Sequence, residues 1–580
     1  MKNIVITSSA VNMEYMFYQC SSLTSLNINN FNTEKVKYMR AMFGFCSSLT
    51  SIDVSHFITP ILKDIAFMFE GCSNLASIYL LSFDTREVMY MDGFFKGCSS
   101  LTTLDISNFD TSSVEYFHYM FDSCRLLTSL NLSNFNTGKI ISMIAMFNGC
   151  YNLKYLDIHN FDTSLVSDMS WMFNDCSSLE SLDIINFNTA NVENMYKMFC
   201  NCSSLTTLDL THFDTSKVKN MGWMFMDCLS LESIDLTNFN TAKVVDMRIM
   251  FGNCNSLTTL NLTNFDTSSV TDVGWMFYQC RNLTYINLSN LNFQSTTEFD
   301  FMFDGCISLK SLDFTQFKTD NAQNMRNMFS RCSSLTSIDL TNLNTSNVAY
   351  MNEMFHGCSS LKSLNLNNFD TLNVENMEWM FYECYKLESL DISSFRTPKV
   401  KSMAAMFVRC KSLTTIDVSQ FDTSQVIDAF NMFEDCPQIT SLDLSRFTTS
   451  SIENMRAMFL NNKKLISLDL SNFDFSKVSD ISHMLAGCSS LRYINVKSLV
   501  INTNIKYTGL IDNSLINPII CIDDMESLNK IISLYQCQKM NDSENWGEYK
   551  DYITNDNNRF INNCLLSKND INCYQICSFN

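Results

Sequence analysis

The 580-residue chain has few glycines, prolines and histidines, with 14, 4 and 6 respectively. No stretch approaches the 18 or more apolar residues of a membrane-spanning helix, and the start MKNIVITSSAVNMEYMF lacks the apolar core of a signal peptide. Basic residues number 40 against 60 acidic ones, so the net charge is -20. Phosphate binding needs clustered Lys and Arg. The composition therefore predicts neither membrane insertion by this chain nor nucleic-acid binding.

Cysteine supplies the clearest pattern. Most cysteines are spaced 26 residues apart, and Asn462 interrupts the series once. The series comprises Cys20, Cys46, Cys72, Cys98, Cys124, Cys150, Cys176, Cys202, Cys228, Cys254, Cys280, Cys306, Cys332, Cys358, Cys384, Cys410, Cys436 and Cys488. A fixed period above 20 residues predicts a solenoid. Repetition also explains why methionine (36) and phenylalanine (46) are so frequent.

One repeat unit, residues 21–46, reads SSLTSLNINNFNTEKVKYMRAMFGFC. Its segment 26–29 alternates apolar and polar residues, which predicts a short strand. From Val36 to Cys46 apolar residues recur at intervals of three and four, which is typical of one face of a helix or of successive helical turns. Thr59 and Thr397 precede Pro60 and Pro398 in this phase, and the pairs are interpreted as a helix N-cap and first helical residue. A lone unit buries too little apolar surface to offset the conformational entropy lost on folding, so neighbouring units must stack with their strands parallel.

The segment CSSLTTLDLTHFDTSKVKNMGWMF, residues Cys202 to Phe225, resembles the repeats of the BspA-like leucine-rich-repeat surface proteins of bacteria and some protists. The resemblance covers about residues 10–500. Leu23, Leu26 and Ile28 fit the leucine-rich pattern, but Phe31 stands at the asparagine position, so a phenylalanine spine is expected to replace the asparagine ladder. The resemblance implies a cell-surface or extracellular protein with an adhesive or host-interacting role and no common ligand.

The predicted fold class is an α/β leucine-rich-repeat-like solenoid, with a parallel sheet on one face and short helices on the other. About 18–19 repeats occupy residues 1–500, and residues 501–580 form a C-terminal segment. The tail cysteines Cys521, Cys537, Cys564, Cys573 and Cys577 are irregularly spaced. They fit a small disulfide module, hence an oxidising compartment, or a C-terminal cap followed by a loose tail.

The cysteine series could supply metal ligands, disulfides or packing atoms. Metal sites need ligands that converge. Equivalent positions in stacked repeats have parallel Cβ vectors, which disfavours bridges even where the spacing allows them. Buried free thiols that act as small hydrophobes are therefore expected. The predicted structural ladder consists of Cys20, Cys46, Cys72, Phe31, Phe57 and Phe83.

An outward strand position carries aspartate in many repeats: Asp53, Asp105, Asp157, Asp183, Asp209, Asp235, Asp313, Asp339, Asp391, Asp417, Asp443 and Asp469. Consecutive carboxylates about 5 Å apart repel by roughly 1 kcal/mol in water, so hydrogen bonds or cations must offset them. The row is either a ligand face or weak calcium rail, or a solvated face that prevents aggregation of the sheet. The candidate partner-binding face is Asp157, Asp183, Asp209 and Asp235, which form an unbroken acidic run expected to attract a basic protein.

The residue before each Met-Phe pair is aromatic at every second repeat from Tyr15 to Trp275. Large and small side chains then alternate, which relieves crowding between neighbouring units. We expect the rings of Trp171, Trp223 and Trp275 to be partly buried and mainly structural. Full exposure would instead make them a ligand-binding ridge.

No enzyme is predicted, because the six histidines are scattered over five phases of the repeat and join no nucleophile or second metal ligand. We expect no catalytic residue, no metal and no cofactor. The leading function is a non-catalytic surface protein that binds another protein, of unknown identity, through the repeat face. The alternative is an intracellular structural scaffold. Met13 and Phe17 are already in repeat phase without a cap before them, which leaves a truncated or misassigned start open.

Overall fold

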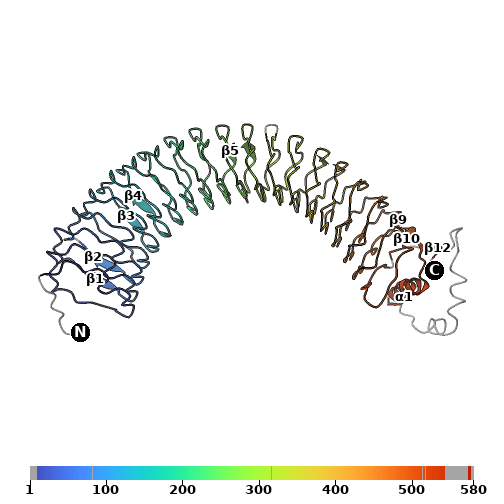
Figure 1. Ribbon diagram of the computed structural model, residues 1–580, viewed down its shortest axis with the longest axis horizontal. Helices are drawn as coiled ribbons and strands as arrows, with labels where there is room; N and C mark the ends of the chain where they lie inside the picture. Colours follow the sequence, from blue (N-terminus) through green and yellow to red (C-terminus); the bar gives the residue numbers. More distant parts are fainter. Residues whose placement is uncertain are drawn as a thin grey trace. The chain divides into compact units, whose positions relative to one another are not determined.

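The structure, a computed structural model, describes residues 9–80, 82–314, 317–512, 514–515, 518–541 and 573–575, with the backbone alone for 534–541 and 573–575. The chain divides into two compact units, residues 1–296 and 297–580. Within each unit, 26-residue coils follow one another side by side (Figure 1). The sequence period is therefore the period of the coils.

Short parallel strands line one side of the coils. In the first unit they are β1 (Ser51–Asp53), β2 (Ser77–Tyr79), β3 (Ser129–Asn131), β4 (Tyr155–Asp157), β5 (Thr259–Asn261) and β6 (Tyr285–Asn287). In the second they are β7 (Ser363–Asn365), β8 (Ser389–Asp391), β9 (Ser467–Asp469), β10 (Tyr493–Asn495) and β11 (Ile519–Cys521), followed by helix α1 (Met525–Asn541) and β12 (Cys573–Gln575). Strands of adjacent coils pair in parallel with a shift of one repeat, as Ile52 with Ile78. The predicted parallel stacking is confirmed.

The predicted helical face is not found in the described repeats. The segment from Val36 to Cys46 is a series of turns, and Ala41 and Phe45 have left-handed backbone angles, with φ of 49° and 58°. Two left-handed residues four apart cannot belong to a right-handed helix. The main-chain N–H groups of Met39 and Ala41 instead donate to carbonyls of the next coil at 2.8 and 2.9 Å. Successive turns, the other arrangement that fits a spacing of three and four, are what this segment forms.

A second parallel ladder runs along these turns. It begins with isolated bridges between Asn12 and Tyr38 and between Tyr38 and Asp64, and the same position continues to Asp272 in the first unit. In the second unit equivalent bridges run from Glu298 to Lys506. We call the outer surface of residues 38–45 and their equivalents the turn face, and the outer surface of the strands the strand face.

Phenylalanine and cysteine fill the interior between the two faces. Phe57 and Phe83 are fully buried and Phe31 nearly so, and their rings stack at centroid distances of 6.5 Å (Phe31 to Phe57) and 6.4 Å (Phe57 to Phe83). A second stack runs through the Met-Phe positions, where Phe43 and Phe69 are 5.5 Å apart. The predicted phenylalanine ladder is confirmed, and a second ladder runs beside it.

The cysteines of the series are free thiols, buried in all but Cys20. Burial raises the pKa of Cys46 to about 11 and that of Cys72 to about 12. Most of the buried thiols also donate to a phenylalanine carbonyl 29 residues earlier, as Cys72 Sγ does to Phe43 at 3.1 Å. The prediction of buried free thiols is confirmed except at Cys20, which is exposed, and a hydrogen-bonding role is added to it.

Asn462, the one exception in the cysteine series, preserves this bond. Its Nδ2 donates to the carbonyls of Phe433 and Phe459 at 2.9 and 3.0 Å, and its Oδ1 accepts from the N–H of Cys436 at 3.0 Å. The side chain is fully buried. A buried amide is tolerated here because all of these polar atoms find partners.

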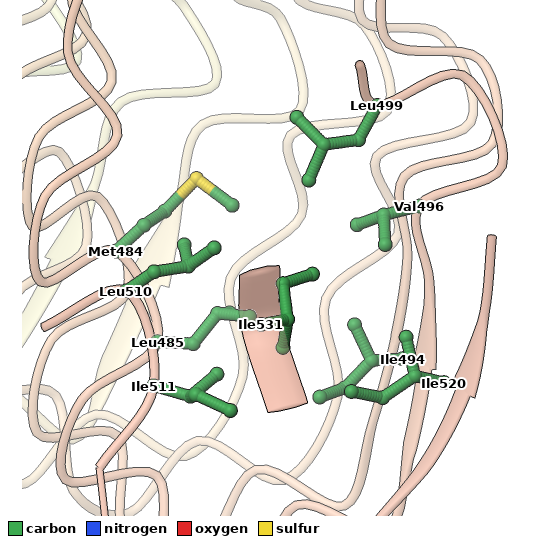
Figure 2. Close-up of a pocket in the computed structure, with 9 residues that line it drawn as sticks. All are labelled: Met484, Leu485, Ile494, Val496, Leu499, Leu510, Ile511, Ile520 and Ile531. Atoms are coloured by element: carbon green, nitrogen blue, oxygen red, sulfur yellow. The ribbon is translucent and has the colours of Figure 1, made fainter. Parts of the chain in front are cut away.

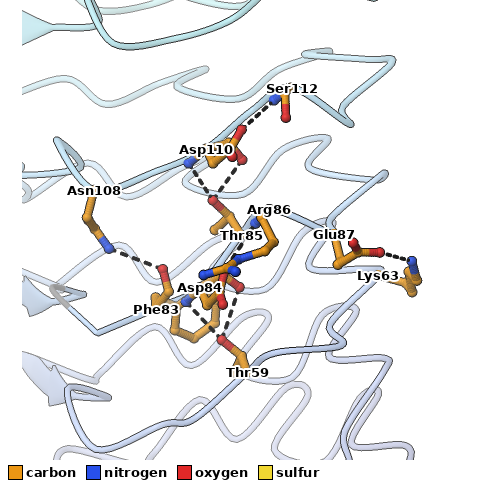
Figure 3. Close-up of polar contacts among 10 residues, drawn as sticks. All are labelled: Thr59, Lys63, Phe83, Asp84, Thr85, Arg86, Glu87, Asn108, Asp110 and Ser112. Atoms are coloured by element: carbon orange, nitrogen blue, oxygen red, sulfur yellow. Dashed lines mark hydrogen bonds and ion pairs between the residues drawn. The ribbon is translucent and has the colours of Figure 1, made fainter.

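A buried threonine ladder joins the coils (Figure 3). The Thr59 hydroxyl donates to the carbonyl of Asp84 at 3.1 Å and accepts from the N–H of the same residue at 2.9 Å. Thr85 repeats the pattern with Asp110 at 2.9 and 2.8 Å. Thr59 is therefore not the helix N-cap that its position before Pro60 suggested. It starts a single turn closed by the N–H of Leu62, and its side chain bonds to the next coil.

An asparagine ladder persists one residue before the phenylalanine spine, so the expectation that phenylalanine replaces it is wrong. Asn108 Nδ2 donates to the carbonyls of Leu80 and Phe83 in the previous coil, both at 3.1 Å. Asn134 does the same to Ile106 and Phe109 at 3.3 and 3.0 Å. The amide ladder and the aromatic spine occupy adjacent positions of the same turn.

The second unit ends in a different structure. Strand β11 pairs in parallel with β10 and antiparallel with β12, which places the backbones of Cys521 and Cys573 opposite each other. Ile531 of α1 is buried between Leu485, Leu510 and Ile511 on one side and Ile494 and Ile520 on the other (Figure 2). Cys521 is disulfide-bonded. The side chains of the other tail cysteines, Cys537, Cys564, Cys573 and Cys577, lie outside the described residues.

Candidate interaction surfaces

The four aspartates of the candidate partner-binding face occupy equivalent positions in successive coils. Asp157 ends β4 and is half-buried, whereas Asp183, Asp209 and Asp235 are exposed. The residue opposite Asp157 in the paired strand β3 is Asn131. The row predicted from the sequence therefore lies on the strand face.

Each of these carboxylates also closes a local turn. The N–H of Thr211 donates to Asp209 Oδ1 at 3.0 Å, and the Thr211 hydroxyl donates to the same oxygen at 2.6 Å. At Asp235 the N–H of Thr237 makes the corresponding bond, at 3.0 Å. Asn131 and Asn261 accept the same kind of bond, from Ser133 at 2.9 Å and Thr263 at 3.2 Å. The turn thus explains an Asp or Asn at this position but not the negative charge.

These turns also change the acidity of the carboxyls. The hydroxyl of Thr211, and then its N–H, lower the pKa of Asp209. The N–H of Thr237 and then its hydroxyl lower the pKa of Asp235, whereas the neighbouring charge of Asp209 raises it. The hydrogen bonds outweigh the repulsion between the two carboxylates, so both stay ionised at neutral pH.

The strand face also carries an exposed aromatic ring. The Tyr155 side chain is 72% exposed and lies two residues before Asp157 in β4, so both point to the same side of the strand. His159 Nδ1 lies 2.5 Å from Asp157 Oδ1. Among the residues that the structure describes, no group of three His, Cys, Asp or Glu side chains is arranged to hold a metal ion.

The aromatic residues before the Met-Phe pairs lie on the turn face. Trp171, Trp223 and Trp275 are half-buried, as predicted, and Trp379 is 39% exposed. Sequence reasoning missed the lysine between the first two: Lys197 Nζ lies 4.2 Å from the ring centroid of Trp171 and 4.3 Å from that of Trp223. The signal was visible, since Lys197 occupies the same phase one repeat away from each tryptophan.

The chain matches a family model along most of its length. The model is described as "Mycoplasma protein of unknown function, DUF285", and it matches residues 5–79, 50–155, 127–233, 201–312, 247–363, 297–412, 336–441 and 384–498. The chain belongs to the DUF285 family. The DUF285 matches cover the strand face and the turn face alike. No curated protein matches this sequence at a significant level.

Solved structures with similarity to this DUF285 chain include three bacterial proteins. A leucine-rich repeat protein from Bacteroides ovatus is 17% identical over 78% of this chain and 80% of its own, with a TM-score of 0.24. A leucine rich cell surface protein from Faecalibacterium prausnitzii is 16% identical over 70% and 82%, with a TM-score of 0.27. A leucine-rich repeat protein from Eubacterium ventriosum is 17% identical over 57% and 83%, with a TM-score of 0.30. At these TM-scores the likeness adds nothing to the coil architecture described above.

Proposed function

We propose that the protein is a non-catalytic interaction protein of the cell surface that binds a basic protein through the strand face near Asp157, Asp183, Asp209 and Asp235. The single observation that carries the proposal is that the charge of this row exceeds what its turns require. Asparagine accepts the same main-chain bond at Asn131. Four carboxylates on one row, three of them exposed, in a chain of net charge -20, attract a cationic partner and speed its association.

The strand face also has the shape that such binding uses. Parallel strands of successive coils present their outward side chains at about 4.8 Å intervals, and solenoids use extended surfaces of this kind for recognition. The exposed ring of Tyr155 beside Asp157 supplies the apolar contact that charges alone lack. Single exposed ion pairs add little affinity, so the four aspartates are expected to act together.

Two observations support the surface location over the intracellular scaffold. The disulfide at Cys521 is typical of an oxidising compartment. The BspA-like resemblance of the repeats implies the same location. In the part of the chain that the structure describes, no helix is long and apolar enough to cross a membrane.

The test replaces Asp157, Asp183, Asp209 and Asp235 together by Asn, which keeps the turn bond and removes the charge. The matched control replaces Asp110, Asp162, Asp214 and Asp266 by Asn; these exposed residues also accept the N–H two residues ahead, and asparagine already occupies their phase at Asn136. Both variants lose four negative charges, but only the first loses them from the strand face.

Immobilised wild-type protein and both variants are used to capture binding proteins from a cell-surface extract at about 50 mM salt, and association rates are then measured at several salt concentrations. We expect the captured partner to bind the control as it binds wild type and to associate more slowly with the strand-face variant. Equal rates and equal salt dependence for all three proteins would show that the strand face is only solvated surface.

A further inference from the structure

An open cavity of about 370 Å³ lies on the turn face of the first unit, away from the strand face. It is lined by Phe67, Tyr90, Asp92, Tyr116, His118 and Tyr119. Three adjacent coils contribute, and Tyr90 and Tyr116 are partners in the bridge ladder. Four aromatic rings thus surround one carboxylate and one imidazole, in a volume typical of small-molecule sites.

The polar groups in this cavity have unused bonding capacity. Asp92 Oδ1 and His118 Nε2 are buried and make no hydrogen bond. The side chain of Asp92 is 15% exposed, and its Oδ1 lies 3.3 Å from His118 Nδ1. A buried carboxylate oxygen without a hydrogen bond is costly, so a ligand that satisfies it would gain affinity.

His118 is the basic side chain that pairs with Asp92, and the nearest arginine and lysine pair with other carboxylates. Arg40 lies over the Phe67 ring at 5.9 Å and pairs with Asp64 at 2.9 Å. Lys96 lies over the Tyr119 ring at 5.0 Å and pairs with Glu70 at 3.1 Å. Each has a carboxylate partner other than Asp92. The rings in this region therefore already attract ammonium and guanidinium groups, while neither Arg40 nor Lys96 forms an ion pair with Asp92.

The same arrangement occurs four repeats later with its cation in place. Phe67, Gly93 and Tyr119 occupy the phase of Trp171, Lys197 and Trp223, each 104 residues further on. There Lys197 Nζ lies just over 4 Å from both tryptophan centroids. The chain therefore shows that aromatic residues in this phase, two repeats apart, can hold an ammonium group between them.

In the first arrangement glycine replaces that lysine. Gly93 has a φ of 54°, and a Cβ added to it would come within 2.4 Å of Phe67 Cδ1. The Phe67 ring thus lies over the glycine, where no side chain from residue 93 can fill the space. Residue 93 therefore supplies no cation between the two rings, and Asp92 stands where the second arrangement has Tyr196.

We propose that this cavity binds an alkylated ammonium group, the head of a choline-like molecule or a methylated lysine side chain. The aromatic rings attract the cation through their π faces, and Asp92 supplies the compensating charge. Methyl groups on the nitrogen suit the cavity better than a bare ammonium, because they contact the rings and lower the cost of removing water. The site is independent of the strand face, so either proposal can fail without the other.

The test is calorimetric titration of the full chain with choline chloride at constant ionic strength. We expect binding with a Kd of about 1 mM or tighter. The neutral isostere 3,3-dimethylbutan-1-ol, which has the same shape without the charge, is expected to bind at least about tenfold more weakly. A trimethyl-lysine peptide distinguishes the two sources: tighter binding than choline indicates a protein side chain, and equal binding indicates a free or lipid-borne choline head. Binding of N-acetylglucosamine without binding of choline would overturn the proposal.

Variants locate the site. Asp92→Asn is expected to lower the affinity for choline about tenfold. The matched control is Asp300→Asn, which should leave that affinity unchanged, because Asp300 occupies the same phase and pairs with Arg326 at 3.6 Å. Lys197→Ala should open the space between the two tryptophans and raise the stoichiometry from one choline to two; alanine already occupies this phase at Ala145. Unchanged affinity in Asp92→Asn, or an unchanged stoichiometry in Lys197→Ala, would contradict the assignment.

Discussion

The threonine ladder offers the most direct measure of what holds one coil to the next. The Thr163 side chain is fully buried; its hydroxyl donates to the carbonyl of Asn188 at 2.9 Å and accepts from the N–H of Asn188 at 2.7 Å. The substitution Thr163→Val keeps the shape of the side chain and removes both bonds. Since the partner groups belong to the backbone of the next coil, they cannot turn toward another acceptor without disturbing that coil.

The expected cost follows from the group left without a partner. An N–H buried without a hydrogen bond costs about 1–3 kcal/mol, whereas a carbonyl without its bond is tolerated more easily. The extra methyl group of valine offsets only part of this loss. We expect a net destabilisation of about 2 kcal/mol, which is about a 30-fold change in the equilibrium for opening this junction.

Amide hydrogen exchange measures the destabilisation at the altered junction, because each repeat of a solenoid couples mainly to its nearest neighbours and a single junction can open locally. The amide of Asn188 is expected to exchange about 30-fold faster in Thr163→Val than in wild type. The matched control is Thr211→Val, which removes only an exposed hydroxyl bonded to Asp209 and should change stability by no more than about 0.5 kcal/mol. Equal exchange at Asn188 in both variants would refute the role of the threonine ladder.

Two further predictions concern the thiols and the carboxyls. In native protein, iodoacetamide should label the exposed Cys20 and leave Cys72 unlabelled, because burial both blocks the Cys72 thiol and raises its pKa to about 12. Mass spectrometry of native and urea-unfolded samples checks this labelling. Rapid labelling of Cys72 in the native protein would contradict the prediction. Asp209 and Asp235 have folded-state pKa values lowered from 3.8, so their stabilisation is present above pH 3.8 and is lost as the pH falls through the lowered values. Stability measured by circular dichroism should therefore lose the contribution of these two carboxylates only below about pH 4, and that loss should not begin between pH 5 and pH 6.

The sequence by itself determined the coil length, the parallel stacking and the identity of the core. A fixed 26-residue period forces equivalent side chains into contact in neighbouring coils, so Phe57 must meet Phe31 and Phe83. The same reasoning makes Cys72 a buried thiol rather than half of a bridge. These features follow from repetition and hydrophobicity, which are both written in the order of residues.

Only the tertiary structure decided what lies opposite the strands. Apolar residues at intervals of three and four suit both an α-helix and successive turns, and the choice depends on where the N–H groups of Met39 and Ala41 find acceptors. They find them in the next coil, which exists only once the repeats have stacked. The left-handed backbone of Ala41 follows from that bonding and could not be predicted from alanine itself.

The same dependence explains the polar ladders and the cavity. The position of Thr59 before Pro60 predicts a local cap, whereas its actual partner, Asp84, is 25 residues away and becomes a neighbour only through stacking. The cation between Trp171 and Trp223 and the packing of the Phe67 ring against Gly93 likewise depend on side chains one and two coils apart. Repetition predicts that such residues lie near one another, but the packing of each ring against the next coil decides whether a lysine or a neighbouring ring occupies the position.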